Sequence, residues 1–255
     1  MRRLLQLSAA ALLGFVAVSH AAAQGARPQF RPALLGTGPD SLVNKINTEE
    51  LLKQGQKDGA VMFCSVTAKD GRLVQNRVYR GMPGTEALRA EVTKQLEETR
   101  VVPAIYNHQP VEVLLYGTVV FSVVNEKPRL QIVLHQDPEE LKKGSDFIGP
   151  QPMFGGESKF TGLTYPQSEH PVQVTGIVDL GLEVDAKGNL GGIHVLAEEP
   201  PLLGFAAAAV EDFAGAKFIP AFRDGDPVAT ETVLPVCYQS EAIEGGNLGP
   251  PPPQE

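Results

Sequence analysis

Residues 176–238 read GIVDLGLEVDAKGNLGGIHVLAEEPPLLGFAAAAVEDFAGAKFIPAFRDGDPVATETVLPVCY, and this stretch decides the fold. From Val178 to Asp185, apolar residues alternate with polar residues or glycine, which is typical of a strand with one buried face. A turn at 187–189 and a second apolar run at 193–196 complete a hairpin. The stretch therefore begins with two antiparallel strands.

The sequence changes to a helical period after the prolines at 200–201. Phe205, Ala209 and Phe213 recur every four residues in an alanine-rich segment, which predicts a helix with one apolar face. A turn at 224–227 then leads to a last strand over 228–238. The predicted unit is β-β-α-β, with the helix packed on a small antiparallel sheet, so the fold class is α+β.

The same pattern occurs earlier, at residues 59–121, displaced by 117 positions without a gap. The positions that are identical in both stretches are glycines, prolines and apolar residues, which a backbone fold dictates. None of them is an acid, a base or a nucleophile, so the repeat disfavours an enzyme. We therefore expect two tandem β-β-α-β modules. Leu88, Val92 and Leu96 take the helical positions of the first module.

The first 23 residues have the features of an export signal. Arg2 and Arg3 precede an apolar run at 4–18, and small residues at 21–23 form the expected cleavage site. The run is shorter than the roughly 20 residues that span a bilayer. We expect cleavage near Ala23 and release into the periplasm, and the alternative is an anchor that is not cleaved.

The remaining chain divides where its composition changes. A strand expected at 129–135 folds back on the last strand of the first module. A short helix, capped by Asn47, precedes that module. The expected layout is an arm with this helix (24–56), the first module with its added strand (57–135), a linker (136–173), the second module (174–240) and a disordered proline-rich tail (241–255).

Charge and residue spacing exclude several functions. The net charge is −8, and loss of Arg2 and Arg3 makes it −10, which disfavours nucleic acid or anionic lipid as a partner. The histidines lack the spacing of metal ligands, and aspartates that resemble paired acids lie where turns favour aspartate. We expect no metal and no cofactor. These residues are His108, His135, His170 and His194, and Asp185, Asp224 and Asp226.

The two cysteines, Cys64 and Cys237, lie one in each module. Apolar Met62, Cys64 and Val66 occupy the face of the first strand that is polar in the second module, so this sheet is expected to be covered on both sides. Cys237 also falls opposite the apparent core residues of its strand. Back-to-back sheets joined by a Cys64–Cys237 disulfide would satisfy both observations, and two unrelated buried thiols are the alternative.

A series of short motifs occurs in a fixed order: Gly155-Gly156, Tyr165-Pro166, 176–178 (GIV), 182–188 (LEVDAKG), the alanine-rich helix, 218–221 (FIPA), 225–228 (GDPV) and 234–236 (LPV). With this series, residues 152–240 resemble the C-terminal domain of the TonB family, the periplasmic end of the energy transducer for outer-membrane transport. Residues 57–123 match more loosely, because Val101 stands where the family has an aromatic residue. The uncleaved anchor and long proline-rich spacer of the family's transducers are not visible here, so the resemblance implies fold and partner class rather than energy transduction.

The resemblance implies that the second module binds a short extended peptide along the edge of its sheet. Such strand addition uses unpaired backbone N–H and C=O groups. The last strand of the first module is expected to be covered by 129–135, whereas 230–239 has no following strand. We therefore expect a non-catalytic periplasmic protein whose partner-binding edge strand carries Thr230, Thr232, Val233, Leu234, Val236 and Tyr238.

The expected partner is an outer-membrane TonB-dependent receptor or another envelope protein, without nucleic acid and without stable membrane insertion. A different interpretation is a structural or assembly scaffold of the cell envelope in which both sheet edges are buried. A homodimer is compatible with either interpretation. An enzyme is the least favoured class, because it needs a pocket with converging titratable groups that the sequence does not indicate.

Overall fold

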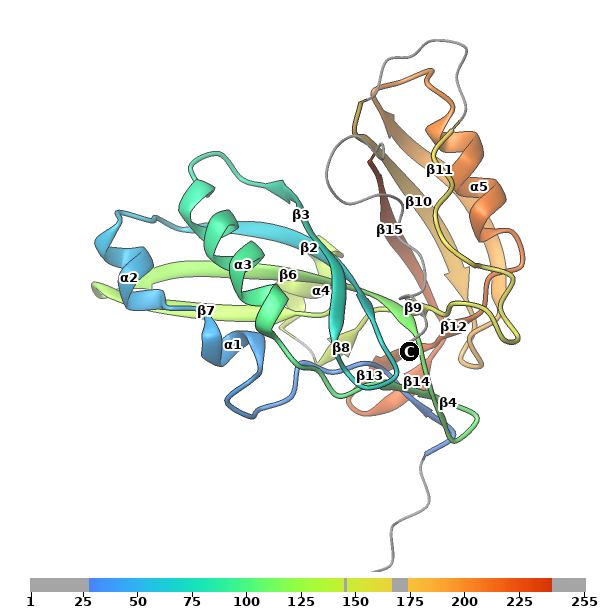
Figure 1. The fold of residues 1–255 in the computed structure, drawn as a ribbon, viewed down its shortest axis with the longest axis horizontal. Helices are drawn as coiled ribbons and strands as arrows, with labels where there is room; N and C mark the ends of the chain where they lie inside the picture. The colour runs from blue at the N-terminus through green and yellow to red at the C-terminus, as the bar shows by residue number, and fades with distance from the viewer. Residues whose placement is uncertain (1–27, 145, 167–173, 240–255) are drawn as a thin grey trace, which may run out of the picture.

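The computed structural model describes residues 28–144, 146–166 and 174–239 (Figure 1). The fold is α+β with antiparallel sheets, which agrees with the fold class expected from the sequence. Two large sheets form the body of the molecule, and each carries a helix on one face (Figure 1). The expected export signal at 1–23 and the tail at 241–255 lie outside the described residues.

The first large sheet has four strands, in the order β3 (Leu73–Gly81), β2 (Gly59–Thr67), β6 (Val113–Val124) and β7 (Lys127–Val133). Helix α3 (Glu86–Glu98) covers one face and buries Leu88, Val92 and Leu96, the positions that the four-residue period selects. The strand expected at 129–135 is present as β7, which pairs antiparallel with β6. That prediction is confirmed, with slightly different bounds.

The second large sheet has three strands, in the order β11 (Leu190–Glu199), β10 (Gly176–Val184) and β15 (Thr230–Tyr238). Helix α5 (Phe205–Phe213) packs on one face and buries Phe205, Ala209 and Phe213, as the sequence predicts. The aromatic rings of this core contact one another, and the Phe160 and Phe213 rings stack at 4.6 Å between centroids. Aromatic burial therefore stabilises the second sheet.

Short strands and helices connect the two large sheets. The sequence indicated the helix after Asn47, and the Asn47 side chain accepts a hydrogen bond from the Glu50 N–H at 3.0 Å. The sequence did not indicate the small sheets. The small sheets are β1 (Phe30–Arg31) with β4 (Ala104–Tyr106) and β5 (Gln109–Val111), β8 (Phe147–Ile148) with β13 (Ala221–Arg223) and β14 (Asp226–Val228), and β9 (Gln151–Pro152) with β12 (Phe218–Ile219). The helices are α1 (Leu42–Lys45), α2 (Thr48–Lys53) and α4 (Pro138–Lys143).

Corresponding elements of the two halves begin 117 residues apart. This offset relates β2 to β10, β3 to β11, β4 to β13, β5 to β14 and β6 to β15. The hairpin turns also share one geometry: Gly71 and Gly188 have φ angles of +83° and +80°. A Cβ atom at Gly188 would lie 1.9 Å from the Phe218 carbonyl oxygen, and one at Gly71 would lie 2.2 Å from that of Val101. Both turns therefore need glycine.

The face of the first sheet that α3 leaves open packs against the second half of the chain. Cys64 and Val66 on β2 are buried, together with Leu114 and Tyr116 on β6. All four belong to the same apolar cluster as the core of the second sheet. The prediction that the first sheet is covered on both sides is confirmed for this part of its face.

Two bidentate ion pairs also join the halves. The Arg80 guanidinium on β3 donates to both carboxylate oxygens of Asp179 on β10, at 2.9 and 3.0 Å. Arg223 on β13 donates to both carboxylate oxygens of Glu140 on α4, each at 2.9 Å. Such paired geometry fixes orientation as well as distance. The halves are therefore held in one relative position by packing and by charge.

The predicted Cys64–Cys237 disulfide is wrong, because both cysteines are free thiols. Each is buried, and Cys64 packs in an apolar cluster with Val66 and Tyr116. Apolar residues on both faces of a strand indicate that both faces of the sheet are buried, and this burial does not require a disulfide between the sheets. Burial raises the pKa of both thiols above its ordinary value.

We predict that both thiols resist a disulfide-exchange reagent in the native protein, because the reactive thiolate is disfavoured by burial. After unfolding without a reductant, both cysteines of the chain should react rapidly. Spectroscopic counting of released thiol before and after denaturation checks this. A denatured, unreduced protein that shows no reactive thiol would restore the disulfide.

We predict a pH-dependent contribution from Glu140. Hydrogen bonds from Arg223 and then Lys143 lower the pKa of Glu140 from its ordinary 4.5 to about 2. Since the unfolded chain holds this proton more tightly, the stabilisation is complete above about pH 4.5 and is lost as pH falls towards 2. Glu140→Gln should lower the free energy of unfolding at pH 7, and its difference from the parent protein should shrink below pH 4.5.

Glu139→Gln is the matched control for this measurement, because Glu139 pairs with Lys142 where both side chains are exposed. Exposed pairs of this kind contribute little. Denaturant unfolding at several pH values compares the two variants. Equal effects of both substitutions at pH 7 would contradict a structural role of the Glu140–Arg223 pair.

Candidate partner-binding edge strand

Strand β15 lies at the edge of the second sheet. It pairs with β10 in an uninterrupted antiparallel register, from Tyr238 opposite Gly176 to Thr230 opposite Val184. Within residues 28–144, 146–166 and 174–239, no strand pairs with its other side. The equivalent strand of the first half, β6, is covered by β7. The edge of β15 is therefore the one that an added strand would meet.

The side chains selected from the sequence fall into two groups. Leu234, Val236 and Tyr238 are buried in the core beneath α5, so a partner does not contact their side chains. Thr230 and Thr232 are partly exposed, and the side chain of Val233 is 40% exposed on the opposite face. The accessible part of the predicted site is thus its first half.

Pro235 sets the direction of the backbone groups along β15. A proline within a strand has no N–H to donate, so this position normally faces away from the neighbouring strand. Antiparallel strands direct the groups of alternate residues to the same side. Glu231 and Val233 therefore direct their N–H and C=O groups to the unpaired side, and Pro235 interrupts the row of donors before Cys237. The sequence carried this signal in the position of Pro235.

The second half of β15 is covered by other parts of the chain. The segments at 134–136 and 149–151 approach the middle of β15, where they line a gap of about 20 Å³ together with Thr232, Val233 and Leu234. Beyond this point, all residues from Leu234 to Tyr238 are buried. The accessible edge is therefore Thr230–Val233, shorter than the strand expected from the sequence.

The opposite edge of the sheet, β11, is less suited to pairing. Its register with β10 shifts twice, between Asp179 and Leu180 and between Glu183 and Val184. Such bulges bend an edge strand and disturb the row of backbone groups that a new strand would need. In contrast, β15 keeps a regular register along its length. Backbone geometry therefore favours β15 over β11.

Negative charge surrounds the accessible end of β15. Glu231 lies directly opposite Glu183 of β10, and both side chains are exposed. Together with Asp185 and Thr230 they line an open cavity of about 350 Å³. The Asp185 carboxylate is held by Asn189 and by the Lys187 N–H, and these hydrogen bonds lower its pKa. This end of the strand attracts a basic group.

No set of residues in the described part of the chain resembles a metal centre. Across 28–144, 146–166 and 174–239, no three His, Cys, Asp or Glu side chains gather closely enough to hold an ion. His194 on β11 and Asp185 at the hairpin turn belong to separate surroundings.

Comparison with known families places this edge strand in a characterised type of domain. Residues 161–239 match the model of the Gram-negative bacterial TonB protein C-terminal, so this part of the chain is a TonB C-terminal domain. The family consists of protein-interaction domains involved in TonB-dependent envelope transport. No curated protein and no solved structure matched the chain. Within the described residues, no helix has the length and apolar character needed to cross a membrane.

We predict that Tyr238→Phe destabilises the covered half of β15. The buried Tyr238 hydroxyl donates to Asp212 at 2.9 Å, and burial raises the pKa of this carboxyl group. Removal of the donor should lower the free energy of unfolding by about 1–2 kcal/mol. The control is Tyr106→Phe, whose hydroxyl bonds the exposed Glu157 and should matter less. Denaturant unfolding measures both, and an equal loss would contradict this anchor.

Proposed function

We propose that this protein binds an extended segment of an envelope protein by strand addition at the Thr230–Val233 half of β15. The observation that supports it best is an unbulged, unpaired and accessible edge within a TonB C-terminal domain. The added strand would accept and donate hydrogen bonds at Glu231 and Val233. The role is non-catalytic, and the expected location is the periplasm.

We also propose that the two halves are copies of one β-β-α-β module, spanning 57–135 and 174–240. The shared 117-residue offset and the matched turns at Gly71 and Gly188 support this. In the first copy the equivalent edge is already occupied, because β7 pairs along β6. The first copy is therefore structural, and the second receives the partner.

The geometry limits the kind of partner. Each backbone hydrogen bond contributes about 0.5–1.5 kcal/mol net, so two residues of open edge give modest affinity by themselves. Glu231 and Glu183 add attraction for a lysine or arginine next to the extended segment. The proposed partner is the periplasmic segment of an outer-membrane TonB-dependent receptor or of another envelope protein.

A structural scaffold is the second candidate function. The burial of Leu234–Tyr238 supports it, because half of the strand is already covered within the molecule. In this alternative the remaining edge pairs with a second copy rather than with a foreign peptide. Sedimentation at several protein concentrations distinguishes the two, since the scaffold alternative requires self-association and the peptide-binding proposal does not.

We predict that Val233→Pro weakens peptide binding by about two- to tenfold, because proline removes one of the two outward donors. Val233→Thr is the matched control, since threonine keeps the N–H and the β-branched shape. Calorimetric titration with peptides from the periplasmic segments of co-expressed receptors measures the affinity, and circular dichroism checks that each variant is folded. Equal binding by Val233→Pro and the parent protein would refute strand addition at this site.

A further inference from the structure

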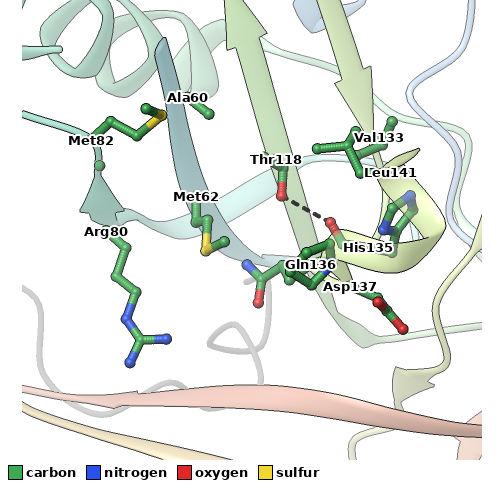
Figure 2. Close-up of a pocket in the computed structure, with 12 residues that line it drawn as sticks. Ala60, Met62, Arg80, Met82, Thr118, Val133, His135, Gln136, Asp137 and Leu141 are labelled. Carbon is green, nitrogen blue, oxygen red and sulfur yellow. Dashed lines mark hydrogen bonds between the residues drawn. The ribbon is translucent and has the colours of Figure 1, made fainter. Parts of the chain in front are cut away.

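A separate cavity of about 350 Å³ lies on the first sheet, on the face opposite α3. Figure 2 shows its lining: Ala60 and Met62 come from β2, Thr118 from β6 and Val133 from β7. Leu141 of α4 forms a wall, and Arg80 lies at the mouth. The second half of the chain covers the neighbouring part of this face, around Cys64 and Val66, but not this part. The cavity size is within the range of small-molecule sites.

The wall atoms that a ligand would contact are mainly carbon and sulfur rather than hydrogen-bonding groups. The Thr118 hydroxyl donates to the His135 carbonyl oxygen at 2.9 Å, and the Gln136 amide nitrogen donates to the Tyr79 hydroxyl. Two polar atoms have no partner, Gln136 Oε1 and His135 Nδ1, but both are fully covered by protein atoms. Met62 and Met82 line the cavity, and methionine adapts its shape to apolar ligands.

The volume decides between an apolar side chain and a longer hydrocarbon. A water-sized group takes about 30 Å³, so the cavity holds about a dozen non-hydrogen atoms. A leucine side chain has about four carbons and a phenylalanine side chain about seven, and neither would fill it. A peptide segment would also bring backbone N–H and C=O groups that these walls do not satisfy. A linear aliphatic chain has the size and the chemistry.

The charges at the mouth select the head group. Arg80 is held by Asp179 at 2.9 Å and approached by Glu199 at 3.9 Å, so its positive charge is already matched. Asp137 adds a further carboxylate at the rim. An anionic head would meet net negative charge there. An uncharged head avoids this repulsion.

We propose that this pocket binds a single aliphatic chain of about a dozen carbons that carries an uncharged head, such as a fatty alcohol or a monoacylglycerol. The site lies on the first module, outside the matched residues 161–239, and does not depend on the binding function of β15. The chain comes either from a free molecule or from a membrane lipid, and both present the same chemistry to the pocket.

Calorimetric titration of the purified protein with 1-octanol, 1-decanol and 1-dodecanol, below their solubility limits, tests the proposal. One molecule should bind per chain, and each added CH₂ should strengthen binding by about fourfold until the cavity is full. Dodecanoate should bind at least tenfold more weakly than 1-dodecanol at pH 7. Non-saturable binding, or a preference for dodecanoate, would overturn the proposal.

Ala60→Phe should abolish binding, because the ring fills the cavity from its floor. Val133→Phe fills it from the neighbouring strand and serves if the first variant does not fold. Ala90→Phe places the same ring on an exposed position of α3 and should bind like the parent protein. Undiminished binding by a folded Ala60→Phe or Val133→Phe variant would place the ligand elsewhere.

Sedimentation with phosphatidylcholine vesicles, with and without monoacylglycerol, separates the two sources of the chain. Co-sedimentation that the cavity-filling variant abolishes would identify a membrane lipid as the ligand. Binding of 1-dodecanol without co-sedimentation would identify a free molecule. Both results support the pocket, whereas co-sedimentation that the cavity-filling variant leaves unchanged, with no alcohol binding, would contradict it.

Discussion

The packing of the second half of the chain against the open face of the first sheet is the constraint on which the rest of the structure depends. A four-stranded sheet with apolar residues on both faces needs two covers, and α3 supplies one of them. Cys64, Val66, Leu114 and Tyr116 are buried only because the second half supplies the other. The ion pair between Arg80 and Asp179 then fixes the position of the second sheet.

That contact determines which backbone groups and which surface stay available. In this arrangement the segments at 134–136 and 149–151 lie close to the middle of β15, at Thr232–Leu234. The exposed part of β15, Thr230–Val233, and the apolar pocket beside Met62 both remain accessible in this arrangement. The packing of the two halves therefore leaves an accessible strand edge on the second module and an apolar pocket on the first.

Local patterns in the sequence predicted the parts of the fold that local patterns control. The period-two strand after Gly176, the helical positions Phe205, Ala209 and Phe213, and the return strand at 129–135 are present. The predicted disulfide was wrong, and the covered half of β15 and the pocket were not predicted. Each of these features depends on contacts between segments that are distant in sequence, and the periodicity of apolar residues does not predict such contacts. Pro235 was the one local signal for the shortened edge, since it interrupts the row of outward donors.

Residue-resolved amide hydrogen exchange of the free protein tests this account most directly. Val233 and Cys237 lie on the same side of β15, but the first is 40% exposed and the second is 1% exposed. The account predicts fast exchange for the Val233 amide and slow exchange for the Cys237 amide, because Val233 is exposed whereas Cys237 is surrounded by protein atoms. Equal protection of both amides would mean that the edge is either fully open or fully buried, and would contradict it.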